Sequence, residues 1–226
     1  MKRRCLGFII PSANTVMEPE IYANLPEGVS AHFSRAYLER DDVEQLKGLR
    51  TEAIRCVREL LSARVHLIAF GCTTGSLVEG REYETGLLKD LRRAGAPLAV
   101  STASAVIDAL HACGAKVVSV AAPYEAWLTQ RVADYLEGFG FQVPETRCLG
   151  IMDHRQAEVT DSLVYQLALE ADHPAADALF ISCTNFPTQA VLAKLRRDLG
   201  KPVISSNSAT LWRSLDLLGI PSAILS

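Results

Sequence analysis

The chain repeats one order of segments, and this repeat constrains the fold more than any other feature. Pro11 follows the apolar run 5–10, and Pro123 follows a similar run 112 positions later. Segments that begin at Val29 and Phe141 are also 112 positions apart. Solenoid repeats are much shorter, so this period predicts two similar lobes. Any α/β chain alternates with some regularity, but a Pro and a Cys-Thr pair shared by both halves favour a true repeat.

Two cysteines end the third strand-like segment of each half. Cys72 follows HLIAFG, and Cys183 follows DALFIS. Because the repeat gives them equivalent places, we expect folding to bring both thiols to one cleft. One thiolate can then attack a carbon or take its proton while the other thiol donates, without a cofactor. Each thiol comes at a strand end that opens a helix, where the helix dipole is expected to lower its pKa.

Strand-like and helix-like segments alternate along the chain. The expected strands are 5–10, 29–37, 65–71, 97–101, 116–121, 141–149, 178–182 and 202–206. The expected helices are 41–63, 80–94, 103–113, 124–138, 156–170, 187–199 and 208–218. Short apolar strands alternating with helices predict an α/β fold in which each lobe is a parallel four-stranded sheet flanked by helices. We expect 1–100 plus 207–226 to form the first lobe and 101–206 the second.

Composition narrows the class of protein. The chain has 226 residues, is 49% hydrophobic and carries a formal charge of −3, which suits a protein with a sizeable core. Lys and Arg are scattered, so we expect no nucleic-acid partner. No apolar stretch approaches the ~20 residues of a membrane span, so no membrane partner is expected either. Six cysteines without a secretory signal predict reduced thiols and a cytoplasmic location. A homo-oligomer is the default for a soluble enzyme.

The sequence predicts neither a metal nor an organic cofactor. It contains no CxxC, HExxH, GxGxxG or Walker motif. The other cysteines, Cys5, Cys56, Cys113 and Cys148, lie in strand-like or helix-like contexts where a free cysteine is usually a small buried apolar residue.

Ligands of such sheets bind beyond the carboxyl ends of the strands. The loops there are rich in Ser, Thr and Asn, and with backbone N–H groups they can form a nest for a small carboxylate. Structural roles are open for several residues. Asn14 can cap a helix that holds Met17, Tyr124 can pack in the core, and His154 can be a solvated or capping residue. Arg35 is expected to form a surface ion pair.

The opening motif PSANTVMEPE, from Pro11 to Glu20, closely resembles that of maleate cis–trans isomerases. The segments around Cys72 and Cys183 resemble the two cysteine motifs of the wider aspartate/glutamate racemase superfamily. The resemblance spans Leu6 to about Leu215. It implies a two-lobed α/β fold with pseudo-twofold symmetry, an active site between the lobes, and no cofactor.

The resemblance also implies roles for individual residues. The Cys72 thiolate attacks the alkene, and Cys183 donates and accepts the proton. Asn14 and Tyr124 match positions that hold the substrate carboxylates. The remaining expected substrate-binding residues are Ser12, Thr73, Thr74, Thr184, Asn185 and His154. Here His154 stands where maleate isomerases usually carry an Asn.

Departures from the motif leave alternatives open. Ser182-Cys-Thr-Asn-Phe-Pro resembles the arylmalonate decarboxylase and ectoine-utilisation branches, although decarboxylases keep only the second cysteine. The acidic residue near the first strand of amino-acid racemases is missing. The leading prediction is an isomerase of maleate or a similar small dicarboxylate. The alternatives are a racemase or decarboxylase acting next to a carboxylate, and a non-catalytic carboxylate-binding protein.

Overall fold

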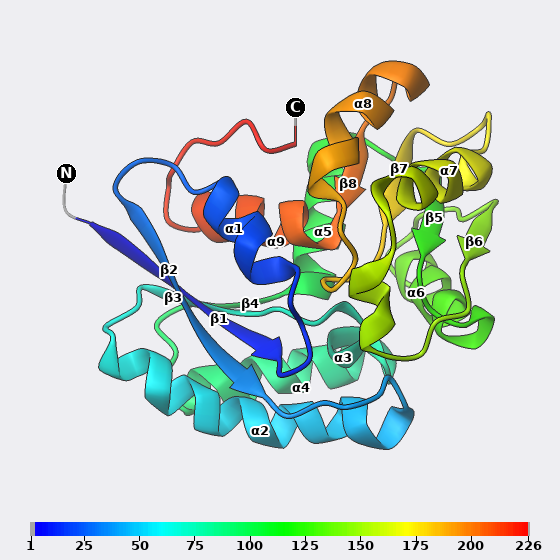
Figure 1. Ribbon diagram of the computed structural model, residues 1–226. Coiled ribbons are helices and arrows are strands. Elements are labelled where there is room, and N and C mark those ends of the chain that lie inside the picture. The colour runs from blue at the N-terminus through cyan, green and yellow to red at the C-terminus, as the bar shows by residue number, and fades with distance from the viewer. Residues whose placement is uncertain (1–2, 226) are drawn as a thin grey trace.

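A computed structural model describes residues 3–225, which contain two parallel four-stranded sheets (Figure 1). The first sheet has the order β2-β1-β3-β4, formed by β1 (Arg4–Pro11), β2 (Val29–Ala36), β3 (Leu67–Phe70) and β4 (Ala99–Ser101). The second has the order β6-β5-β7-β8, formed by β5 (Val118–Ala122), β6 (Thr146–Cys148), β7 (Ala178–Ile181) and β8 (Val203–Ser205). The strand order is the same in both, so the predicted repeat of one sheet topology is confirmed.

Helices connect and cover the strands. They are α1 (Met17–Ala23), α2 (Val43–Ser62), α3 (Thr73–Leu77), α4 (Gly80–Arg93), α5 (Thr102–Ala112), α6 (Ala126–Glu137), α7 (Asp161–Ala171), α8 (Gln189–Leu199) and α9 (Ser206–Asp216), with a 3-10 turn η1 (His154–Glu158). In Figure 1, α2 and α4 lie on one side of the first sheet, with α1 and α9 on the other. All residues of β3 and β7 are buried, which explains their continuous apolar sequences.

Two expected elements differ from the structure. The expected helix 156–170 is divided into η1 and α7, because Val159 is extended and the Thr160 side chain caps α7 by accepting from Leu163 N. The expected strand 141–149 shortens to β6, which pairs only with β5. Pro144, which has no N–H to donate, precedes this edge strand.

Helices α5 and α9 join the two halves. Each follows the last strand of its sheet and begins with a capping box, Ser101 with Ser104 and Ser205 with Ser208. The helices pack on each other, and Thr102 Oγ1 lies 2.9 Å from Thr210 Oγ1 in the buried contact. Both helices contact β4 and β8. They therefore form a layer shared by the sheets, and the assignment of 207–226 to the first lobe stays a prediction.

The remaining cysteines are not uniformly buried. Cys56 is buried and Cys5 and Cys113 are partly buried, but Cys148 is exposed. The expectation of a buried Cys148 was wrong because this residue lies on the edge strand β6. Within residues 3–225, no helix is both long and apolar enough to cross a membrane.

Candidate active site

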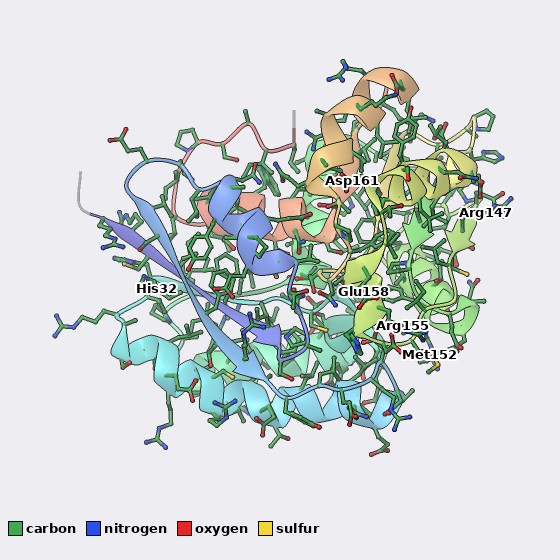
Figure 2. The ribbon with its side chains drawn as sticks, viewed as in Figure 1. His32, Arg147, Met152, Arg155, Glu158 and Asp161 are labelled. Carbon is green, nitrogen blue, oxygen red and sulfur yellow. The ribbon has the colours of Figure 1, made fainter. Side chains whose placement is uncertain are left out.

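The carboxyl ends of β1, β3, β5 and β7 meet around one cavity that opens to solvent, and its empty space, open solvent included, is about 410 Å³. Its lining comprises Pro11, Ala13, Asn14, Leu38, Glu39, Arg40, Asp41, Cys72, Thr73, Thr74, Tyr124, Asp153, His154, Gln156, Cys183, Thr184 and Asn185. The η1 segment bounds this cavity, and Figure 2 labels Arg155 and Glu158 on it. The fold therefore brings both predicted cysteines together, as the repeat requires.

Cys72 faces groups that can donate to its sulfur. It is the N-cap of α3, and its Sγ accepts from Gly75 N at 3.3 Å. Thr74 Oγ1 lies 3.8 Å from the same sulfur. Burial raises the pKa of the Cys72 thiol to about 12, and the negative charge of Asp41 adds to this effect. The predicted lowering of the pKa by the helix end was wrong, because desolvation of the thiolate outweighs these donors.

Cys183 has a different environment. Its backbone φ is 106°, a value that residues other than glycine rarely adopt. Its N–H donates to Ser206 Oγ at 3.0 Å. The thiol donates to Gln156 Oε1 at 3.0 Å and accepts from Asn185 N at 3.2 Å. Burial and then the charge of Asp41 raise its pKa, while a hydrogen bond from the Tyr124 hydroxyl opposes the rise.

Asn14 has the capping role expected for it and also lines the cavity. Its Oδ1 accepts from Val16 N and Met17 N at 3.0 and 2.9 Å. Its Nδ2 donates to Thr184 Oγ1 at 3.0 Å, across the cavity lining. Both roles therefore coexist in one side chain.

The other expected residues hold the loops around the cavity. Thr73 Oγ1 donates to Ser206 Oγ at 2.8 Å, and Asn185 Oδ1 accepts from Thr15 N at 2.9 Å. Tyr124 is 2% exposed, and its hydroxyl accepts from Ser182 Oγ at 3.5 Å. Its pKa is raised by burial, then by the charge of the adjacent Cys183.

The structure places Ser12 and Arg35 outside the cavity lining and His154 within it. Ser12 is outside the cavity lining, because its hydroxyl is paired with Leu38 N and Leu38 O at 3.1 and 3.2 Å. His154 is exposed and lines both this cavity and the adjoining open hollow. Arg35 forms an ion pair with Glu18 at 2.8 Å, which confirms the expected surface ion pair.

Five polar residues of the lining are not among the site residues expected from the sequence, namely Glu39, Arg40, Asp41, Asp153 and Gln156. Gln156 Nε2 donates to Asp41 Oδ2 at 2.7 Å, and Asp41 N donates to Met152 O at 3.1 Å. Burial raises the pKa of Asp41 to about 6, against the opposing hydrogen bond from Gln156. The expected helix 41–63 begins at Asp41, but in the structure Asp42 caps α2. Gln156 lies in the expected helix 156–170, where the sequence gives no signal of a site residue.

The part of the chain that the structure describes contains no group of three or more His, Cys, Asp and Glu side chains arranged to hold a metal ion. The cavity lining offers a pair of thiols, three carboxylates, one guanidinium, one imidazole, one phenol, and several hydroxyls and amides.

Comparison with known proteins then decides the family. A family model described as arylmalonate decarboxylase matches residues 6–225. The chain belongs to this family. It is 30% identical to a maleate isomerase from Alcaligenes faecalis over 239 residues, covering 99% of this chain and 94% of that protein. The resemblance to this group expected from the opening motif is confirmed.

Solved structures of family members have the same fold. A maleate isomerase from Pseudomonas putida S16, a cysteine-to-alanine variant with maleate, has a TM-score of 0.93 at 29% identity, covering 100% of this chain and 98% of that one. A maleate cis–trans isomerase from Nocardia farcinica, a cysteine-to-serine variant with a covalently bound succinylcysteine intermediate, has a TM-score of 0.89 at 27% identity. This match covers 96% of this chain and 94% of that chain.

Proposed function

We propose that this protein is a cofactor-independent isomerase that converts maleate, or a similar small cis-dicarboxylate, into its trans isomer. The observation that carries the proposal is the placement of Cys72 and Cys183 in one cavity, with donors around the first sulfur and an acceptor beside the second. Relatives named as maleate isomerases over nearly the full chain support it.

The reaction needs one proton shared by the thiol pair, with Cys72 as the thiolate and Cys183 as the thiol. The lone pair of Cys72 Sγ forms a bond to one alkene carbon. The π electrons take the Cys183 proton at the other carbon, which leaves Cys183 as a thiolate. The carbons are then joined by a single bond that can rotate. Cys183 removes the proton again, the C–S bond breaks, and the trans alkene and the Cys72 thiolate form.

The cavity supplies hydrogen-bond donors to the substrate carboxylates. We assign the amide of Asn14 and the hydroxyls of Thr74 and Tyr124 to this role, because each lines the cavity. Such preorganised donors also stabilise the negative charge that develops as the thiolate adds. His154 lies at the opening and is assigned to the entry of the anionic substrate.

Decarboxylation of a substituted malonate is the second candidate, and the name of the matching family model favours it. The presence of Cys72 favours the isomerase, since a single thiol can protonate the product of a decarboxylation. Because the isomerase requires both cysteines as free thiols, we also propose that the protein works in the reducing cytoplasm. The homo-oligomer stays a prediction.

Proton NMR in deuterated buffer tests the proposal directly. Purified protein is incubated with maleate, without added cofactor, beside Cys72→Ala and Cys148→Ser. We expect fumarate with the wild type and with Cys148→Ser, whose thiol is exposed and outside the cavity, and none with Cys72→Ala. Absence of fumarate with the wild type, together with loss of carbon dioxide from a substituted malonate, would replace the isomerase by the decarboxylase.

A further inference from the structure

Gln156 is fixed in one orientation by its neighbours. Its Nε2 donates to Asp41 Oδ2 at 2.7 Å and to Ile151 O at 3.0 Å, and the side chain is 2% exposed. Rotation of the amide by half a turn would set its oxygen against a carboxylate and a carbonyl. Those groups can only accept, so both hydrogen bonds would be lost in a buried place. The amide oxygen of Gln156 therefore always faces Cys183.

In this orientation Gln156 stabilises only the protonated form of Cys183, the thiol. An amide oxygen accepts a hydrogen bond from a thiol, and the 3.0 Å contact between Cys183 Sγ and Gln156 Oε1 is of this kind. A thiolate has no hydrogen to donate, so it would face the oxygen lone pairs at the same distance. A hydrogen bond to the neutral form of an acid disfavours its charged form. Asn185 N and the Tyr124 hydroxyl act in the opposite direction, as donors to the sulfur.

Among the hydrogen-bond partners of Cys72 in the described chain, Gly75 N can only donate and the Thr74 hydroxyl can donate or accept, so no partner is fixed as an acceptor. The equivalent thiols of the two halves are therefore distinguished by their neighbours. The sequence repeat does not predict this difference. Gln156 lies in η1, which follows β6, whereas the equivalent strand of the first half, β2, is followed by α2.

We propose that Gln156, oriented by Asp41, is the positioning residue that keeps the shared proton on Cys183 rather than on Cys72. In the reaction this contact makes the Cys183 thiolate short-lived, so the proton returns to Cys183 when the product forms. The catalytic part of the inference rests on the proposed function, but the placement of the proton does not.

Alkylation of Cys183 measures the placement without any turnover. In a Cys72→Ala background, the rate of iodoacetamide reaction at Cys183 is followed by peptide mass spectrometry between about pH 7 and pH 9, since only the thiolate reacts. Gln156→Met keeps the length of the side chain and removes its acceptor. We expect it to speed alkylation about tenfold at equal pH, the effect of losing one buried hydrogen bond. Gln156→Glu keeps an acceptor next to the thiol and adds a negative charge, so alkylation should not be faster than in the parent.

Two further variants complete the test. Asp41→Asn removes a charge that itself raises the pKa of Cys183, and its amide can either accept from or donate to Gln156, so alkylation should again be faster. Gln130→Met is the matched control, because Gln130 donates to Asp134 at 2.8 Å on the exposed face of α6, away from both thiols. If Gln156→Met unfolds, Gln156→Leu, which also lacks the acceptor, takes its place.

The outcomes separate this inference from the proposed function. An alkylation rate in Gln156→Met equal to that of the parent, with both proteins shown to be folded by thermal unfolding, would overturn the inference. If Cys183 is alkylated faster as expected but the wild type makes no fumarate, the proposed function fails and the proton placement stands. With both correct, Gln156→Met in the wild-type background should lower kcat at least about tenfold with KM within about threefold.

Discussion

Asn14 and Thr184 connect the two cysteine loops across the cavity, since Asn14 Nδ2 donates to Thr184 Oγ1 at 3.0 Å. Thr184 Oγ1 in turn donates to Gly71 O at 3.1 Å, directly before Cys72. A single path of hydrogen bonds therefore joins the loop after β1, the loop after β7 and the loop after β3. This path fixes the position of each thiol relative to the residues that we assign to the substrate carboxylates.

Asn14→Asp should separate the structural and binding roles of this residue. Aspartate still accepts from Val16 N and Met17 N, so the start of α1 is retained. It loses the donor to Thr184 and adds a negative charge where a carboxylate should bind. We expect kcat/KM for maleate to fall about 100-fold, as for loss of a preorganised donor. Asn24→Asp, at a partly buried asparagine outside the cavity lining, is the control, and an Asn14→Asp enzyme with the wild-type kcat/KM would refute the assignment.

Asp41→Asn should change how stability depends on pH. Burial raises the pKa of Asp41 from its ordinary value of 3.8 to about 6. Between these values the folded protein keeps a proton that the unfolded chain has released, so the contribution of Asp41 to stability falls as pH rises through this window. The difference in free energy of unfolding, variant minus wild type, should therefore be larger at about pH 7 than at about pH 4.

Urea denaturation of both proteins at the two pH values measures this difference. Asp42→Asn is the control, because Asp42 caps α2 through Gln45 N and asparagine is an equally good cap. An equal difference for Asp41→Asn at both pH values would show that Asp41 does not hold a proton in the folded state.

The backbone at Cys183 should prefer glycine to alanine. Its φ of 106° is strained for any residue with a Cβ. We expect Cys183→Gly to be more stable than Cys183→Ala by about 1 kcal/mol in chemical denaturation. Cys72 has a φ of −143°, so at this position alanine should be at least as stable as glycine. The same order of stabilities at both positions would mean that Cys183 is not strained.

Gly75→Ala should disturb the Cys72 thiol. A Cβ at Gly75 would lie 2.9 Å from Leu49 Cδ1 and 3.0 Å from Cys72 Sγ, closer than such atoms pack. We expect turnover to fall at least about tenfold through displacement of the sulfur. Gly48→Ala on α2 is the control, since its Cβ would meet no described atom within 4 Å and alanine favours helix. Unchanged turnover in Gly75→Ala would show that the position of the sulfur is not critical.

The two sheets and the cysteine pair could be predicted from the sequence, because both follow from local patterns. Buried parallel strands are short apolar runs, and Cys72 and Cys183 each follow one of these runs. The repeat then places their ends at one cavity. Ser101 and Ser205, each followed three positions later by a second serine, are also local signals, and both form capping boxes.

Contacts between distant loops could not be predicted in this way. Asp41 and Gln156 are 115 positions apart, and neither belongs to a repeated motif. The raised pKa of Cys72 has the same origin, since it depends on burial under segments that are remote in sequence. Ser12 matched a motif, but its hydroxyl is paired with Leu38, a contact set by how the loops after β1 and β2 approach each other.

The central claim is that Cys72 attacks the substrate while Cys183 moves the proton, and mass spectrometry of Cys183→Ser with maleate tests it most directly. In this variant the carbanion takes its proton from water, and the neutral serine hydroxyl is too weak a base to remove that proton again, so the adduct should accumulate. We predict a mass increase of one maleate on the peptide that contains Cys72, absent from the Cys72→Ala, Cys183→Ser double variant. An unmodified Cys72, or an adduct on another residue, in a protein whose wild type converts maleate would contradict the account.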